Sequence, residues 1–169
     1  MTFELAVIVY QAANGRISHF NTTTPLYGAL FTAMGIAITI LTAWTGYIGY
    51  LFFRLKSIEI SASYLWGIRL GIVLFVIFSF EGGWMAARLS HTIGAPDGSE
   101  GFPIVNWSKS YGDMRIAHFF GMHALQILPL VGFYLSKNIR TKVIVSVIYF
   151  AFVSLVFIQA MMGKPLLGF

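Results

Sequence analysis

Residues 26–53 read LYGALFTAMGIAITILTAWTGYIGYLFF, a run with no Asp, Glu, Lys or Arg. An α-helix needs about 20 predominantly apolar residues to cross the hydrocarbon core of a bilayer, and this run is longer than that. Thr24 and Pro25 precede it, which is typical of a helix start, because Thr caps the first turn and Pro is tolerated at its first position. Trp44 and Tyr50 suit the interface at its far end. The stretch therefore predicts a transmembrane helix.

Three further apolar runs have the same character. They cover residues 67–88, 114–135 and 141–162. The chain of 169 residues is 57% hydrophobic and only 10% charged, more apolar surface than a soluble domain of this size could bury. The fold class we expect is an all-α integral membrane protein. It is a four-transmembrane-helix bundle forming a single membrane domain over residues 1–169, without repeats. Residues 1–13 are too short an apolar run to span, and predict an interfacial helix.

Local signals refine the third span. Ser110 and Asp113 have the spacing of a capping box, which places the start of the helix near Met114. Pro129 lies inside the span and cannot donate an amide hydrogen bond to the carbonyl of Leu125. A kink is therefore expected at this proline.

Lys and Arg residues give a prediction of the topology. Six lie near the two short connections, against five on the side of the termini and the connection 89–113. The first group is Arg54, Lys56, Arg69, Lys137, Arg140 and Lys142. Positive charge in short loops marks the cytoplasmic side. We therefore expect both termini and the connection 89–113 to be extracytoplasmic, in a bacterial inner membrane.

Composition and motifs exclude several classes of function. The net charge of +5 comes from scattered cations that form no basic stripe, so we expect no nucleic-acid partner. The chain has no cysteine, which excludes disulfides, thiolate metal sites and cysteine nucleophiles. It also has no phosphate-binding loop and no nucleophile elbow. Whether the protein is an enzyme is left open by the sequence.

Ionisable side chains inside a span are costly, and Glu81, His118 and His123 are three of them. They lie at similar depth if the second and third helices are antiparallel neighbours. We therefore expect Glu81 to lie within direct or water-bridged hydrogen-bonding reach of Arg88, His118 or His123. The other candidate residues around this cluster are Trp84, His91, Arg115, Met122 and Gln126, of which Gln126 is placed to orient the His123 ring.

Two histidines in one helix suggest a bound cofactor, most directly haem b for electron transfer or redox chemistry. His118 and His123 are five residues apart, about 140° around the helix, so they predict separate ligands rather than one small centre. His91 or His19 could supply a second ligand. Gly82 and its neighbour Gly83 would admit a porphyrin edge. In helix number and intramembrane histidines the chain resembles the small four-helix membrane cytochromes b, in which histidines clamp haem inside a bundle.

Three alternatives stay open. The first is a transition-metal ion, such as zinc or copper, held by Glu81, His118 and His91, or by His118 and His123 as separate ligands. The second is a proton pathway through the same residues. In the third, the polar cluster is purely structural, and the chain is an accessory subunit of a larger membrane complex or a homo-oligomer. Small residues of the first span, from Gly28 to Ala37, suit such packing against a partner.

Overall fold

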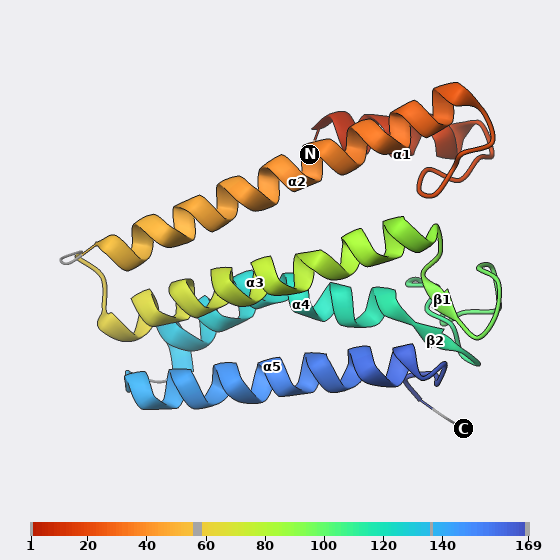
Figure 1. Ribbon diagram of the computed structural model, residues 1–169. Coiled ribbons are helices and arrows are strands. Elements are labelled where there is room, and N and C mark those ends of the chain that lie inside the picture. The colour runs from red at the N-terminus through yellow and green to blue at the C-terminus, as the bar shows by residue number, and fades with distance from the viewer. Residues whose placement is uncertain (1, 56–58, 136, 168–169) are drawn as a thin grey trace. The chain divides into compact units, whose positions relative to one another are not determined.

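A computed structural model describes residues 2–55, 59–135 and 137–167, and is all-helical apart from two short strands (Figure 1). The helices are α1 (Thr2–Ala13), α2 (Pro25–Arg54), α3 (Ala62–Arg88), α4 (Met114–Leu130), the π-helical turn η1 (Val131–Leu135) and α5 (Ile139–Met161). Four helical segments, with η1 continuing α4, are long and apolar enough to cross a membrane. The four predicted spans are therefore confirmed as helices, with ends that differ by a few residues.

Residues Met1–Trp44 form one compact unit, made of α1 and the first part of α2. The helix predicted at the N-terminus is confirmed as α1. The start of α2 is also as predicted, since the Thr24 hydroxyl accepts a hydrogen bond from the Tyr27 amide over 3.3 Å. Between the two helices, Asn21 donates its side-chain amide to Gln11 over 3.0 Å, and both side chains are buried.

The second unit, Thr45–Phe169, has a core in which α4 packs against α3 and α5. Glycines allow α3 and α4 to approach closely. A Cβ atom on Gly67 would lie 2.6 Å from the carbonyl oxygen of Leu128, and one on Gly71 would lie 2.9 Å from that of Ala124. One on Gly121 would overlap the Phe78 side chain. These contacts run along much of both helices, so α3 and α4 are antiparallel neighbours, as expected.

Regular α-helical hydrogen bonding ends soon after Pro129. The π-helical turn η1 follows it directly, which is one of the usual responses of a helix to a missing amide donor. The ammonium group of Lys142, in the first turn of α5, donates to the Val131 carbonyl over 2.6 Å. Lys142 is only 2% exposed, so it belongs to the core rather than to a loop.

A second basic residue that was expected to mark topology also has a structural role. The guanidinium group of Arg69 donates to the carbonyls of Phe52 and Leu55 at the end of α2, over 2.8 to 3.2 Å. A cation bonded to the last carbonyls of a helix also suits the helix dipole. Lys56 lies outside the described residues. Because Arg69 and Lys142 bond to backbone carbonyls within the fold, they indicate the cytoplasmic side less strongly than loop cations would. The orientation of the termini stays a prediction.

The connection 89–113 is folded and closes one end of the core, called here the loop end (Figure 1). Strands β1 (Thr92–Ile93) and β2 (Gly112–Asp113) pair antiparallel within it. Asp113, not Ser110, is the N-cap of α4, with its carboxylate accepting from the Arg115 amide over 3.1 Å. The helix begins at Met114 as predicted, but the predicted capping box is wrong, because strand pairing holds Asp113 in an extended conformation and makes it the cap.

Candidate functional site

Glu81 lies on the buried face of α3, with only 7% of its surface exposed. Leu74, Phe78 and Met85 line the same face at helical spacing. In the described part of the chain Glu81 makes no hydrogen bond or ion pair, and its Oε2 atom is fully covered without a partner. The expected direct bond to Arg88, His118 or His123 is therefore not formed, while the expected water bridge stays a prediction. A buried carboxyl without a partner is unusual, which makes Glu81 the first candidate for a functional residue.

His118 reaches from α4 to the same turn of α3. Its Nδ1–H group donates to the carbonyl of Phe78 over 3.1 Å. Its ring lies over Gly82, where a Cβ atom would come within 3.1 Å of Cε1 and 3.4 Å of Nε2. The glycine is thus needed to seat the imidazole. Because Nδ1 carries the proton, Nε2 of the neutral ring is left as a proton acceptor next to the turn that carries Glu81.

His123 is on a different side of α4, as the 140° separation predicted. Its Nδ1–H group donates over 2.6 Å to the carbonyl of Phe119 in its own helix. The centroids of the His123 imidazole and the Phe119 ring are 4.1 Å apart. This carbonyl, not Gln126, orients the ring, and Gln126 is exposed. His123 is only partly buried, unlike the core residues on either side of it, Gly121 and Ala124.

The remaining candidates do not converge on one centre. Trp84 and Arg88 are exposed on α3, with Trp84 52% exposed. Met122 faces α3 and accepts a hydrogen bond from the Ser79 hydroxyl over 3.3 Å. Arg115 turns to the loop end, where it forms a bidentate pair with Asp113 at 3.0 and 2.6 Å. His118 and Met122 of α4 contact the part of α3 that carries Glu81, at Phe78 and Ser79.

His91 belongs to a separate polar network at the loop end. Its Nδ1 atom lies 3.5 Å from Asp97 and 3.7 Å from Asp113. Burial, reinforced by the Arg115 charge, holds the pKa of His91 below its usual value, although both carboxylates oppose this shift. Burial alone would raise the pKa of Asp97. Hydrogen bonds from Ser90, Thr92 and the His91 amide outweigh that effect and lower it.

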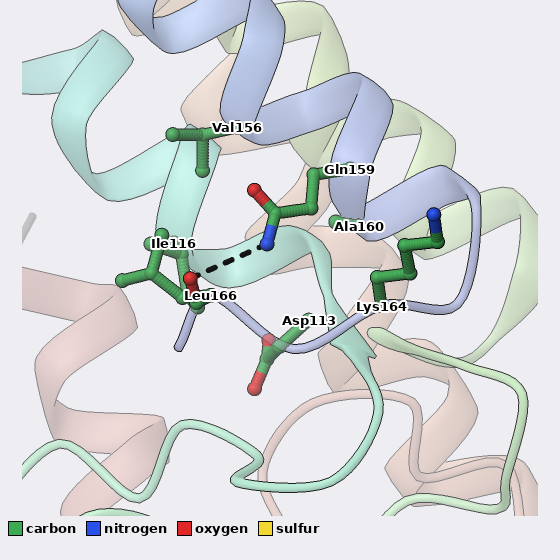
Figure 2. Close-up of a pocket in the computed structure, with 7 residues that line it drawn as sticks. All are labelled: Asp113, Ile116, Val156, Gln159, Ala160, Lys164 and Leu166. Carbon is green, nitrogen blue, oxygen red and sulfur yellow. Dashed lines mark hydrogen bonds between the residues drawn. The ribbon is translucent and has the colours of Figure 1, made fainter. Parts of the chain in front are cut away.

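Asp113 also borders a narrow pocket between the start of α4 and the end of α5 (Figure 2). The chain folds back after α5, and the amide of Gln159 donates to the carbonyls of Pro165 and Leu166, the latter over 3.3 Å. The pocket has no room for a water molecule. Gln159 thus fastens the C-terminal segment to the core.

The described residues fit a bound haem at His123 better than a metal ion or a haem at His118. No group of three or more His, Asp or Glu side chains within the described ranges could hold a metal ion, and His91 lies in its own network away from Glu81 and His118. A porphyrin does not fit between α3 and α4 at His118, because Gly82 is in contact with the imidazole itself. His123 does fit as a haem ligand, since a histidine that donates from Nδ1 to a carbonyl presents Nε2 for iron.

Sequence reasoning missed three polar residues that α5 directs into the core. They are Lys142, Ser146 and Tyr149, spaced by four and three residues, and this helical periodicity was readable in the sequence. It also missed Asp97, whose turn-forming neighbours Pro96 and Gly98 were the available signal. Comparison with known proteins found no matching family, no similar curated protein and no similar solved structure.

Proposed function

We propose that this chain is a four-span membrane protein that binds and releases protons at Glu81 and His118. The observation that carries this proposal is the buried Oε2 atom of Glu81, which has no hydrogen-bond partner in the described chain. A charged carboxylate in a span costs about 2.5 to 3.5 kcal/mol on insertion scales, and an unpaired buried polar group adds to that cost. A residue that only joined two helices would be bonded to the other helix, as Tyr149 is to Phe120.

The neighbouring imidazole gives the carboxyl a chemical partner. The Phe78 carbonyl fixes the proton of His118 on Nδ1, so Nε2 can accept a proton from Glu81 through a water molecule and return it. The two groups together can hold one proton in alternative positions. Glu81 is the carboxyl that exchanges the proton, and His118 is the base that receives it.

Infrared difference spectroscopy after a pH jump tests this directly. The wild-type protein should show the carbonyl stretch of a protonated carboxyl in an apolar environment, and Glu81→Gln should remove it. Glu59→Gln is the matched control, because Glu59 is exposed. His118→Gln should shift the pH at which the band changes. A band that persists unchanged in Glu81→Gln would overturn the proposal.

A second candidate function is haem b binding for electron transfer at His123. The specific observation is the 2.6 Å hydrogen bond from Nδ1 to the Phe119 carbonyl, which leaves Nε2 available on the partly open side of α4. When bound, haem b would supply one-electron redox chemistry. His123 would hold the iron, and Phe119 would fix the ring orientation.

A further inference from the structure

We propose that the tip of an uncharged hairpin in the connection 89–113 inserts into the interfacial region of the lipid bilayer beside α4. The hairpin consists of residues 101–108, GFPIVNWS, which contain no Asp, Glu, Lys or Arg. Glu100 and Lys109 flank it and form an ion pair across its base, with Nζ 2.7 Å from the carboxylate. This inference rests on the four spans of the proposed function, but not on proton exchange at Glu81 and His118.

Backbone hydrogen bonds hold the hairpin in one shape. Gly101 and Ser108 pair as an antiparallel bridge at its base. Next to this bridge the Phe102 amide donates to the Trp107 carbonyl over 2.8 Å. The Phe102 carbonyl in turn accepts from the Asn106 amide, also over 2.8 Å. The tip, residues 103–105, is therefore presented by a fixed scaffold.

Ile104, in the middle of the tip, combines a strained backbone with complete exposure. Its φ of 73° lies in the left-handed region, and the Val105 amide donates across it to the Pro103 carbonyl over 2.9 Å. Such a γ-turn is rare and strained, and a positive φ is especially unfavourable for a β-branched residue. The Ile104 side chain is fully exposed and Val105 is 41% exposed. Holding apolar side chains out in this way gains nothing in water, so the tip indicates contact with an apolar surface.

The base of the hairpin lies beside the span that begins at Met114. The centroids of the Trp107 and Phe119 rings are 5.4 Å apart. Phe119 is five residues after Met114, roughly 7.5 Å along the helix axis. The span Met114–Leu135 has 22 residues, about 33 Å of helix, which is little more than the roughly 30 Å of the hydrocarbon core. The bilayer boundary is therefore close to Met114, and Trp107 packs against α4 below this residue.

The tip lies within reach of the interfacial region. The Arg115 guanidinium donates to the Asn106 carbonyl over 2.5 Å, which ties the hairpin to the first turn of α4. Ile104 is two residues from Asn106, and two residues of extended chain span at most about 7 Å. The headgroup region is about 5 to 7 Å thick on each side of the hydrocarbon core, and aromatic and uncharged residues are favoured there. A lipid surface fits better than a protein groove, because Phe119 beside the hairpin is itself 43% exposed on a span.

Spin labelling of the full chain tests this insertion, because the chain has no cysteine that would also react. The variants Ile104→Cys and Val105→Cys are labelled with a nitroxide and reconstituted into phosphatidylcholine vesicles. Cysteine is not β-branched, so it fits the γ-turn more easily than isoleucine. Both labels should collide more often with oxygen, which dissolves in lipid, than with a water-soluble nickel chelate. Ser110→Cys is the matched control, because Ser110 is exposed in the same connection but outside the hairpin.

The ratio of oxygen to nickel collisions distinguishes the surroundings of the tip. A ratio several times higher at both tip positions than at the Ser110 control supports insertion into lipid. A ratio at the tip that is no higher than at the control would overturn the proposal. Low collision rates with both reagents would show that protein covers the tip, which also overturns it. A missing infrared response of Glu81 would remove the proposed proton site and leave the result at the hairpin unchanged.

Discussion

Replacing Gly67 by alanine should destabilise the protein, because α3 and α4 touch backbone to backbone at this position. The added Cβ would lie 2.6 Å from the Leu128 carbonyl oxygen and 3.0 Å from the Cα atom of Pro129. Ordinary contact begins near 3.4 Å, so the helices must separate by about 0.8 Å (3.4 minus 2.6). Both neighbours are backbone atoms and cannot rotate away as a side chain could.

The expected loss of stability in Gly67→Ala is the difference between two opposing free-energy contributions. Overpacking a well-packed core costs about 1 to 3 kcal/mol, and a rigid backbone neighbour puts Gly67 at the upper end of that range. Alanine gains about 1 kcal/mol over glycine in a helix interior. The net loss is therefore about 2 kcal/mol, or roughly a 30-fold shift of the unfolding equilibrium. Gly83→Ala is the matched control, because no described atom lies within 4 Å of its added Cβ, and it should be stabilised by up to about 1 kcal/mol.

Reversible unfolding in mixed detergent and dodecyl sulfate micelles, followed by helical circular dichroism, measures both variants. The expected difference between them is about 3 kcal/mol, since both gain the same helix propensity and only Gly67 meets a neighbour. Equal stability of the two variants, or a more stable Gly67→Ala, would refute the packing of α3 against α4 described here. The position of His118 over α3 would then lose its support.

Three further outcomes are expected. A reporter that is active only outside the cytoplasm should be active when fused to the C-terminus, and activity of a cytoplasm-only reporter there would reverse the topology. The connection 89–113 should become more accessible to protease as the pH falls below about 6.5, because the lowered pKa of His91 favours the neutral ring in the folded state. Accessibility should rise again as the pH falls below the usual Asp value of 3.8, because the lowered pKa of Asp97 stabilises the folded connection only while its carboxylate is charged. His91→Asn should abolish the first transition and Asp97→Asn the second, whereas a pH-independent cleavage rate would contradict the network. Finally, the purified protein should show a haem Soret band that His123→Ala removes and His118→Ala retains, and a wild-type protein without haem would exclude this second function.

Apolar length and helix-start chemistry made much of the fold predictable. The run 26–53 contains no charge, and Thr24 caps it as expected. Errors arose where tertiary contacts override local signals. Strand pairing in the connection 89–113 moved the cap of α4 from Ser110 to Asp113. Lys142 looked like a loop cation, but its ammonium group bonds to a carbonyl next to η1, a contact that no local pattern encodes.

The candidate residues can be picked out in the sequence, but their geometry cannot. Glu81 and His118 stand out because ionisable groups are rare in spans, and the structure places both at one contact of α3 with α4. The role of Gly82 could not be read from sequence, since a glycine that seats an imidazole and one that admits a porphyrin look alike. The direction of the His123 ring depends on the Phe119 carbonyl, and backbone acceptors carry no sequence signature.

The separation of the two histidines around α4 gives them different chemistry. His118 bonds across to the Phe78 carbonyl of α3, and its ring lies over Gly82. This close packing suits the proposed proton exchange better than it suits a macrocycle. His123 instead bonds to the Phe119 carbonyl of its own helix and is only partly buried. Loss of proton exchange with His118→Gln, and of a cofactor with His123→Ala, would therefore be independent effects. A variant at one histidine that removed both activities would show that the sites are coupled, which the 140° separation argues against.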